Sequence, residues 1–407
     1  MLLYNAAIAL YDLAVYLLFP FSRKPRKMVK GHWVVYDQLR QQREEDAEYI
    51  WFHAASLGEF EQGRPMIEEI RRRHPDKKIL LTFFSPSGYE VRKHYEGADV
   101  VCYLPFDKPR NVRKFLDLAR PSMAFFIKYE FWKNYLDELK RRGIPTYSVS
   151  SVFRKDQVFF KWYGGLYRKV LHDFTCLYVQ NELSRRYLGR IGVTDVKIVG
   201  DTRFDRVLEI MHRAKELPIV EAFRGDGPVL VAGSSWQPDE ELFIRYFNEH
   251  PGMKLIIAPH VIDDLHLVDI INRLKRPYVR YSKATPDKAA KADCLIVDCY
   301  GLLSSTYRYG NISYIGGGFG VGIHNTLEAA VYGMPVVFGP KFQKFVEAKE
   351  LIEVGGAYTI NDYTGLETLL DRFISDKAFL DKTGDAAGHY VMSRAGATEK
   401  ILADIGL

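Results

Sequence analysis

The sequence predicts an α/β protein with two doubly wound domains, each a parallel sheet covered by helices on both faces. Short apolar runs alternate with helical patterns along most of the 407 residues, and this βαβ rhythm is typical of parallel sheets. The rhythm lapses in a polar stretch between Glu209 and Gly227, which we interpret as a linker. The length suits two domains of about 200 residues each. We therefore expect an anchor helix with a basic flank at 1–30, a first domain at 31–210 and a second at 211–407.

The predicted strands are short runs rich in β-branched and aromatic residues. In the first half they are Tyr49–His53, Lys78–Phe83, Val100–Tyr103, Met123–Ile127, Pro145–Val149, Cys176–Val179 and Val196–Val199. In the second half they are Val229–Ala232, Lys254–Ala258, Leu295–Val297, Ser313–Ile315 and Val336–Phe338. Ligands of doubly wound sheets bind outside the carboxyl ends of the strands, so we expect the functional residues there, in the cleft between the domains.

Helical periodicity fills the stretches between these strands, for example Arg64–Arg73 and Asn111–Ala119. The C-terminal stretch also reads as helices, with Thr364 and Glu367 at the spacing of a capping box, and it is free to pack back on the first domain. Hydrophobic residues at 47% and charged residues at 27% are ordinary for a folded chain, which excludes extended disorder.

The N-terminal segment Met1–Phe21 is almost wholly apolar and about as long as a helix that crosses a bilayer. Its polar residues Asn5, Asp12 and Tyr16 fall on one helical face, so a helix lying in the membrane surface is as plausible as a spanning one. A helix buried in the soluble fold is the third alternative. Five basic residues follow the segment and favour the cytoplasmic side and anionic lipid: Arg23, Lys24, Arg26, Lys27 and Lys30.

A second aromatic and basic stretch lies between the two predicted domains. Its members interleave rings with positive charges: Arg154, Lys155, Phe159, Phe160, Lys161 and Trp162. Such a face binds nucleic acid by stacking or lies at a membrane interface, and core aromatics on an ordinary helix are the structural alternative. The apolar N-terminus favours the membrane, so we expect a membrane or acceptor face and no nucleic-acid partner.

The glycine-rich stretch Gly316–Gly322 lies between a predicted strand and a helix predicted at Thr326–Tyr332. Glycine lets the backbone approach an anion closely, and the N–H groups that open a helix stabilise negative charge, so this turn indicates a phosphate site that includes Gly317 and Gly318. The spacing is not that of the dinucleotide or P-loop fingerprint. Glycine-rich turns without a ligand are also common in α/β proteins, and that alternative stays open.

Other strand ends of the second half converge on this turn in the predicted sheet. Ser234 and Ser235 offer hydroxyl and amide groups that suit a phosphate. The sequence predicts no metal: His260 and His266 do not share one helical face with the nearby aspartates, and no Asp-x-Asp pair occurs. The four cysteines are scattered, with neither a disulfide framework nor metal spacing.

Two carboxylates follow predicted strands in the first half. Glu59 comes after Tyr49–His53 and a loop of small residues, at the position of a general base that removes a proton from an attacking hydroxyl. A simple helix cap is the alternative role for Glu59. Glu130 is flanked by aromatic residues and is either a contact for a sugar or acceptor, or a surface acid paired with Lys128.

Several stretches, in this order along the chain, resemble the Kdo transferases, the 3-deoxy-D-manno-octulosonic acid transferases of lipopolysaccharide synthesis. They are His53–Glu59, Lys128–Trp132, Gly200–Asp205, Ala258–His260 and Gly322–Ala330. The resemblance implies a GT-B fold and an enzyme at the cytoplasmic face of the inner membrane. It implies metal-independent, inverting transfer of Kdo from CMP-Kdo to a lipid A precursor, with no cofactor.

The resemblance also implies roles for individual residues. Glu59 would be the general base and Glu130 a second acidic residue of the site. The resemblance and the phosphate site predicted from the strand ends together give the set of residues expected to hold CMP. These residues are Ser234, Ser235, Pro259, His260, Tyr300, Gly301, Leu302, Gly317, Gly318, His324, Asn325, Thr326, Leu327 and Glu328. Two alternatives remain: another GT-B enzyme, such as a UDP-sugar transferase or an epimerase, and a non-catalytic protein that binds anionic lipid.

Overall fold

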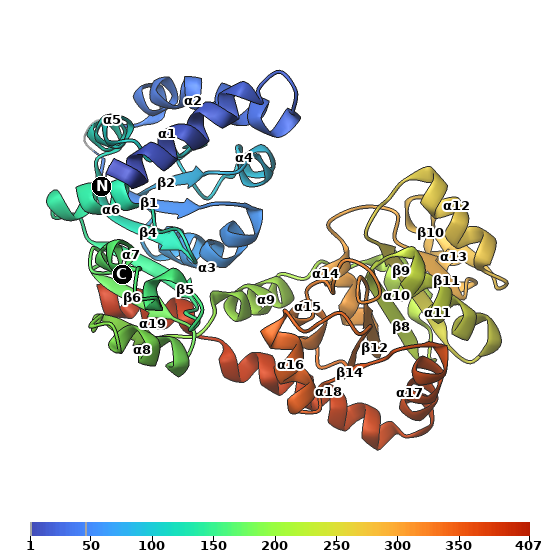
Figure 1. The fold of residues 1–407 in the computed structure, drawn as a ribbon. Helices are drawn as coiled ribbons and strands as arrows, with labels where there is room; N and C mark the ends of the chain where they lie inside the picture. Colours follow the sequence, from blue (N-terminus) through green and yellow to red (C-terminus); the bar gives the residue numbers. More distant parts are fainter. Residues whose placement is uncertain (1, 45–46) are drawn as a thin grey trace. The chain divides into compact units, whose positions relative to one another are not determined.

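The computed structural model describes residues 2–44 and 47–407, which fold into two compact units (Figure 1). Unit 1 comprises residues 1–206 and 395–407, and unit 2 comprises 207–394. Each unit holds one parallel sheet of seven strands. The predicted pair of doubly wound sheets is therefore confirmed. The last helix of the chain, α19 (Ala397–Ile405), belongs to unit 1 and buries Ile401 and Leu402 in its core.

The sheet of unit 1 has the order β3-β2-β1-β4-β5-β6-β7. Its strands are β1 (Tyr49–Ala54), β2 (Lys78–Phe83), β3 (Val100–Tyr103), β4 (Pro121–Ile127), β5 (Thr146–Ser151), β6 (Cys176–Val179) and β7 (Val196–Ile198). Its helices are α1 (Leu2–Leu17), α2 (Arg23–Gln42), α3 (Leu57–Arg73), α4 (Pro86–Arg92), α5 (Pro109–Ala119), α6 (Lys133–Arg141), α7 (Gly165–Leu171) and α8 (Glu182–Gly189), with α19. One apolar core joins the sheet to α2, α5, α6 and α8, and a second joins it to α3 and α19.

The sheet of unit 2 has the order β10-β11-β9-β8-β12-β13-β14. Its strands are β8 (Val229–Ser235), β9 (Lys254–Pro259), β10 (Tyr278–Arg280), β11 (Cys294–Ile296), β12 (Ile312–Ile315), β13 (Val336–Phe338) and β14 (Ala357–Thr359). Its helices are α10 (Pro218–Arg224), α11 (Gln237–Glu249), α12 (Asp264–Arg273), α13 (Pro286–Ala290), α14 (Leu303–Thr306), α15 (Leu327–Ala330), α16 (Val346–Glu353), α17 (Tyr363–Ser375) and α18 (Lys377–Arg394). All predicted strands of this half are present, and β10 and β14 are additional.

Both sheets reverse their winding direction beside their first strand. In unit 1 the chain builds β2 and β3 on one side of β1 and then returns to add β4 on the other side; in unit 2 the corresponding neighbours are β8 and β12. The carboxyl ends of two strands at such a switch point leave a crevice because the following connections diverge, and ligands of doubly wound sheets bind there. The fold therefore points to the ends of β1 and β4, and of β8 and β12.

The predicted linker at 209–227 is wrong, because most of this stretch is helical. Helix α9 (Thr202–His212) runs across the boundary between the units, and α10 follows it. Pro218 occupies the first turn of α10, where its missing N–H costs nothing, and Gly225 ends that helix with a positive φ of 58°. The Pro and Gly that looked like linker residues are helix boundary residues.

The predicted capping box of Thr364 and Glu367 is also wrong. Helix α17 is capped two residues earlier, where Asp362 accepts a hydrogen bond from the Gly365 N–H at 2.8 Å. Asp is as good a cap as Thr, and the spacing rule could not choose between two neighbouring candidates.

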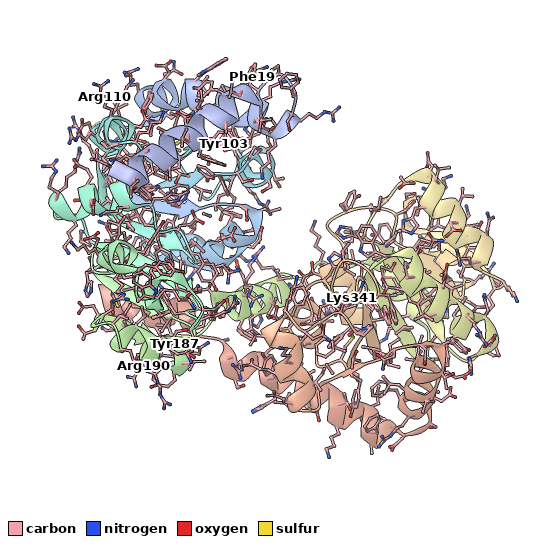
Figure 2. All side chains as sticks on the ribbon, in the orientation of Figure 1. Phe19, Tyr103, Arg110, Tyr187, Arg190 and Lys341 are labelled. Atoms are coloured by element: carbon pink, nitrogen blue, oxygen red, sulfur yellow. The ribbon has the colours of Figure 1, made fainter. Side chains whose placement is uncertain are left out.

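The apolar N-terminal segment forms a helix that ends before the basic residues begin. Helix α1 has 16 residues; Met1 lies outside the described residues. Within residues 2–44 and 47–407, no helix combines the length and the apolar character that crossing a membrane requires. Helix α2 then packs tightly on the sheet. A Cβ on Gly31 would lie 2.1 Å from the buried ring of Tyr103 (Figure 2), so only glycine fits there.

Candidate functional site

Glu59 lies in the first turn of α3, directly after the carboxyl end of β1. The hydroxyl of Ser56, the residue before the helix, donates a hydrogen bond to Glu59 Oε2. Among the described residues, Ser56 makes no side-chain cap to the helix backbone, so the Ser-x-x-Glu spacing does not form a capping box here. The half-buried carboxylate is instead held at the strand end through one of its two oxygens.

Glu130 lies three residues beyond β4, and two aromatic rings orient its carboxylate. Trp132 Nε1 donates to Glu130 Oε2 at 2.7 Å, and His53 Nε2 is 3.3 Å from the same oxygen. His53 is fully buried within β1. Because β1 and β4 pair in parallel, with His53 beside Phe126, the two acidic residues singled out in the sequence follow adjacent strand ends at the switch point of this sheet.

Three residues with a strained backbone also lie at the carboxyl ends of strands. Lys128, Ser150 and Ser234 have positive φ angles of 64°, 57° and 52°, and they lie at or just beyond the ends of β4, β5 and β8. A left-handed conformation costs a non-glycine residue about 1 kcal/mol or more, so it persists only where the surrounding structure enforces it. Such strain is typical of functional sites, and here it marks the carboxyl edges of both sheets.

In unit 2 the glycine-rich turn leaves β12 and folds back on itself. The N–H groups of Gly320 and Gly322 both donate to the Gly317 carbonyl, at 3.0 and 2.9 Å. A Cβ on Gly316 would lie 2.3 Å from the Ser234 carbonyl oxygen, so the turn packs directly on the end of β8. The predicted strand-to-helix turn is present, but its helix α15 has only four residues. The bonded amides of the turn are not available to a phosphate.

Asp239, in the first turn of α11, ties this turn to β8. Its buried carboxylate accepts hydrogen bonds from the Gly317 N–H at 2.8 Å, the Trp236 N–H at 3.0 Å and the Tyr314 hydroxyl at 3.0 Å. Burial raises the pKa of Asp239. Asp239 is not among the predicted site residues; its position one turn after a strand end was the signal that could have found it.

Three rings form a column at the ends of β8 and β9 and after the glycine-rich turn. The centroids of Trp236 and His260 are 4.8 Å apart, and those of His260 and His324 are 4.3 Å apart. Trp236 Nε1 donates to His324 Nε2 at 3.0 Å, which leaves Nδ1 to carry the proton of the neutral ring. Burial, with the neighbouring His260, lowers the pKa of His324 to about 4. The neutral His324 ring thus keeps one N–H, at Nδ1, in the region where an anion was predicted.

The His-Asn-x-x-Glu segment is ordered by its own side chains. Asn325 Nδ2 donates to Glu328 Oε1 at 2.9 Å, and the Leu327 N–H donates to Asn325 Oδ1 at 3.1 Å. Thr326 is buried, and within the described structure its hydroxyl oxygen lacks a hydrogen-bond partner. Gly318 is packed against the backbone of Gly339. These residues and the ring column gather around the glycine-rich turn.

The remaining residues predicted to bind CMP lie in two places, at the ends of β8 and β9 and beside the loop that follows β9. Pro259 ends β9 beside Ser235, whose hydroxyl donates to Glu240 Oε1 at 2.8 Å. Tyr300 is 74% exposed, and its hydroxyl accepts a hydrogen bond from the Ile262 N–H at 3.3 Å. Tyr300, in the predicted segment with Gly301 and Leu302, therefore adjoins the loop after β9.

The predicted aromatic and basic face is partly wrong. Phe159 is only 6% exposed and belongs to the apolar core of unit 1, so it cannot contact a membrane or acceptor. Phe160 is half-buried against Tyr187, and Arg190 lies over the Tyr187 ring (Figure 2). Of the named residues, those exposed are Arg154, Lys155 and Trp162, with Lys161 half-buried. The alternation of rings and charges arises because Phe159 packs in the core of unit 1 while Arg154, Lys155 and Trp162 lie at its surface.

Comparisons with known proteins identify relatives across both units. The family model of 3-deoxy-D-manno-octulosonic-acid transferase (kdotransferase) matches residues 30–206. The 3-deoxy-D-manno-octulosonic acid transferase of Aquifex aeolicus is 28% identical over 353 residues, which are 84% of this chain and 91% of that protein. The enzyme of the same name from Haemophilus influenzae is 24% identical, over 87% of this chain and 85% of its own.

A solved structure extends the likeness of the fold. The UDP-GlcNAc 2-epimerase of Neisseria meningitidis, bound to UDP-GlcNAc, matches with a TM-score of 0.62 at 13% identity and covers 88% of this chain and 99% of its own. The two parallel sheets form a GT-B fold. The family model lies within unit 1 and the relatives of one name run along most of the chain, so the chain is similar to the 3-deoxy-D-manno-octulosonic acid transferases (Kdo transferases) in both units.

Proposed function

We propose that this enzyme transfers Kdo from CMP-Kdo to a lipid A precursor with inversion at the anomeric carbon, in lipopolysaccharide core biosynthesis, and that Glu59 is its general base. One observation carries the proposal. The two acids lie at the β1/β4 switch point of unit 1, while the neutral ring of His324 lies, with Trp236 and His260, at the β8/β12 switch point of unit 2. A proton acceptor and an anion site are the two parts that such a transfer needs.

Unit 1 suits the acceptor side of the reaction. In the proposed step, Glu59 takes the proton of the acceptor hydroxyl while the bond between the Kdo anomeric carbon and the donor phosphate breaks. The Ser56 hydroxyl bonded to Glu59 Oε2 keeps the carboxylate oriented, so its other oxygen is the one that receives the proton. Glu130 is the second acidic residue of this site, at the adjacent strand end.

Unit 2 suits the donor side. The leaving group is a nucleoside monophosphate, which carries less charge than a diphosphate. The proposed donor contacts are the neutral ring of His324, the ring of His260 and the segment Asn325–Glu328. Asp239 holds the glycine-rich turn that shapes this site but, being buried, does not itself face the phosphate.

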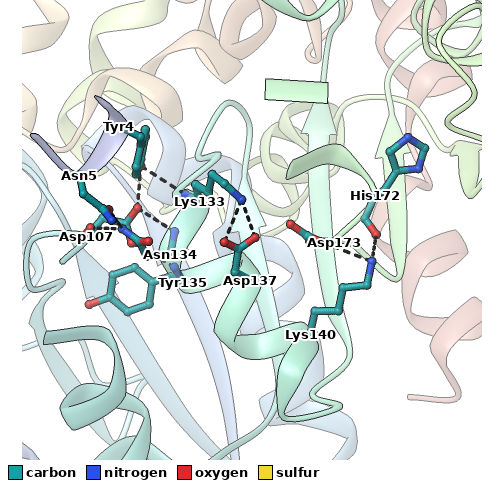
Figure 3. Close-up of polar contacts among 10 residues, drawn as sticks. All are labelled: Tyr4, Asn5, Asp107, Lys133, Asn134, Tyr135, Asp137, Lys140, His172 and Asp173. Carbon is teal, nitrogen blue, oxygen red and sulfur yellow. Dashed lines mark hydrogen bonds and ion pairs between the residues drawn. The ribbon is translucent and has the colours of Figure 1, made fainter. Parts of the chain in front are cut away.

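We also place the enzyme at the cytoplasmic face of the inner membrane, with α1 lying in the membrane surface. The polar side of α1 docks on unit 1: Tyr4 donates to Asp107 at 2.6 Å, and Asn5 accepts from Asn134 Nδ2 at 2.9 Å (Figure 3). Asp107 also accepts the Asn134 N–H at 3.0 Å, so it joins α1 to the start of α6. On the same side of α1, Asp12 pairs with Lys108.

The opposite side of α1 is apolar and exposed. Its large side chains, with those of the turn that follows, are Leu2, Leu3, Leu10, Leu13, Leu17, Leu18 and Phe21, all at least half exposed. The adjoining basic residues Arg23, Lys24, Arg26, Lys27 and Lys30 are exposed as well. An apolar helix side beside a cluster of positive charges is the pattern of an interfacial helix on anionic lipid.

Incubation of the full-length enzyme with CMP-Kdo and a lipid A precursor, with product masses read by mass spectrometry, tests the proposal. We expect the lipid to gain one or more Kdo residues and CMP to be released. Transfer from a UDP-sugar but not from CMP-Kdo would replace the proposed donor. Binding to anionic vesicles without any transfer would contradict the proposed reaction.

A further inference from the structure

A chain of polar contacts runs through unit 1 from its core to Glu130. Trp51 Nε1 donates to Thr82 Oγ1 at 2.8 Å, and Thr82 Oγ1 is 2.9 Å from His53 Nδ1. His53 Nε2 is 3.3 Å from Glu130 Oε2, to which Trp132 Nε1 donates at 2.7 Å. The side chains of Trp51, Thr82 and His53 are completely buried, whereas that of Glu130 is 14% exposed. The chain therefore ends at a carboxylate that reaches the surface.

The chemistry of these groups fixes the direction of the two tryptophan contacts, whereas the direction of the two His53 contacts depends on which ring nitrogen carries the proton. Each tryptophan N–H can only donate, so Thr82 accepts from Trp51 and Glu130 accepts from Trp132. An unprotonated His53 Nε2 would turn its lone pair toward the carboxylate, which is repulsive. Trp132 Nε1 also lies 3.2 Å from His53 Nε2, but its contact with Glu130 Oε2 is shorter, at 2.7 Å, and we assign its N–H to the carboxylate. In the resulting arrangement His53 Nε2–H donates to Glu130 and His53 Nδ1 accepts from the Thr82 hydroxyl, whose other acceptor, the Phe52 carbonyl, is more distant at 3.4 Å.

We infer that His53 is a positioning residue: with Trp132 it clamps Glu130 Oε2 between two ring N–H donors, so that Glu130 Oε1 accepts a hydrogen bond from a hydroxyl of the sugar acceptor. The inference rests on the proposed function only for the identity of the acceptor. A carboxylate fixed through one oxygen has lost its rotational freedom before the substrate arrives, and such preorganisation favours one orientation of the bound hydroxyl.

The clamp has a structural signature that needs no substrate. Nitrogen-15 NMR of the full-length enzyme, with histidines labelled and His53 assigned by substitution, reports which ring nitrogen carries the proton. We expect a neutral His53 with its proton on Nε2. A proton on Nδ1 alone would overturn the inference whether or not the enzyme transfers Kdo. An enzyme with the expected ring state that fails to transfer Kdo would instead contradict the proposed function.

Two substitutions separate positioning from mere packing. In His53→Gln the side-chain amide keeps an N–H near the position of Nε2, whereas His53→Asn is too short to reach Glu130. We expect kcat/KM for the acceptor to fall about tenfold in His53→Asn, as for the loss of one hydrogen bond to a charged group, and to be largely restored in His53→Gln. The KM for CMP-Kdo should not change. Equal losses in both variants, or a change in donor KM, would contradict the clamp.

A double-mutant cycle closes the test. If His53 acts through Glu130, then His53→Asn should have no further effect on turnover in a Glu130→Gln background; additive effects would show that the two side chains act separately. Should the His53 variants fail to fold, Thr82→Val and Thr82→Ser replace them, because only serine keeps the hydroxyl bonded to Nδ1. The matched control is Thr146→Val, since Thr146 is equally buried in the same sheet and donates to the Ile144 carbonyl.

Discussion

The two sheets place aromatic rings at the same edge but use them in opposite ways. At the β1/β4 end of unit 1, the N–H groups of His53 and Trp132 converge on the carboxylate of Glu130. At the β8/β12 end of unit 2, the N–H of Trp236 is spent on another ring, His324, and the rings stack in a column. Unit 1 thus has carboxylate oxygens at this edge of its sheet, and unit 2 has a column of rings in which His324 is neutral.

The acidic residues of the two units differ in their exposure. Glu59 and Glu130 stay at the surface of unit 1, whereas Asp239 of unit 2 is 1% exposed and satisfied by three donors of its own unit. A buried, saturated carboxylate holds structure, and a partly exposed one with a spare oxygen can accept a proton. Under the proposed function, one fold used twice provides an acceptor side and a donor side, and the two sides differ in what the ring N–H groups bind.

The largest effect is expected when the proposed base of unit 1, Glu59, is neutralised. Glu59→Gln removes the proposed base without changing its shape, and general-base catalysis typically contributes about 10²–10⁴-fold. Turnover of CMP-Kdo should fall by that range, while CMP affinity, measured by calorimetry, stays the same. Glu69→Gln, on the same helix but remote from the strand end, is the control. Near-full activity of Glu59→Gln would remove the base assignment.

The next effect concerns the exposed apolar side of α1 in unit 1. Replacing both Leu10 and Leu13 on the exposed side of α1 by serine should reduce binding to anionic vesicles by at least about tenfold, because each buried leucine contributes about 1.5–3 kcal/mol. Leu265→Ser is a matched control, since Leu265 is 85% exposed on α12 of unit 2. Vesicle sedimentation measures the difference. Unchanged binding of the double variant would rule out α1 as the anchor.

A smaller effect should appear on the donor side. Asp239→Asn places an NH₂ group among the donors of Gly317, Trp236 and Tyr314, so at least one of these hydrogen bonds is lost and the glycine-rich turn loosens. We expect CMP affinity to weaken about tenfold, the equivalent of about 1.4 kcal/mol. Asp371→Asn is the control, because Asp371 also accepts a tyrosine hydroxyl, that of Tyr246, at an exposed position. Equal affinities in the two variants would contradict the role of Asp239.

The smallest effect is the pH dependence that His324 contributes in unit 2. The pKa of His324 is lowered to about 4 from its usual 6.5, so the folded protein binds fewer protons than the unfolded chain between these values. The contribution of His324 to stability is therefore complete above about pH 6.5 and is lost as the pH falls toward 4. NMR titration of the His324 ring should show it neutral at pH 5. A midpoint near 6.5 would contradict its burial in the ring column.

Much of this arrangement could be predicted from the sequence. Mostly apolar runs located twelve of the fourteen strands of the described residues, and β10 and β14 escaped because their three-residue runs are not continuously apolar: each includes a polar residue, Arg280 or Thr359. Glycines at a strand end located the turn after β12. Proline and glycine, however, led to the wrong prediction of a linker at 209–227. The same two residue types occur in irregular linkers and at the first and last positions of helices, so their presence does not distinguish the two.

The polar partners could not be predicted. Nothing in the local pattern of His53 indicates that it meets Glu130, 77 positions later, because the contact depends on the parallel pairing of β1 with β4. The same holds for Asp239 and Gly317, which lie 78 positions apart. Phe159 misled for the converse reason: ring-rich stretches look alike in sequence whether they line a core or a surface.

The indole N–H signals of the protein test the contrast between the two units most directly. The chain has five tryptophans, and Trp236 and Trp132 report on the ends of β8 and β4 respectively. In nitrogen-15 spectra of the full-length enzyme, CMP should shift the Trp236 indole signal and leave that of Trp132 unchanged, whereas a solubilised lipid A precursor should do the reverse. A CMP-induced shift of Trp132 with Trp236 unaffected would contradict the assignment of donor and acceptor sides.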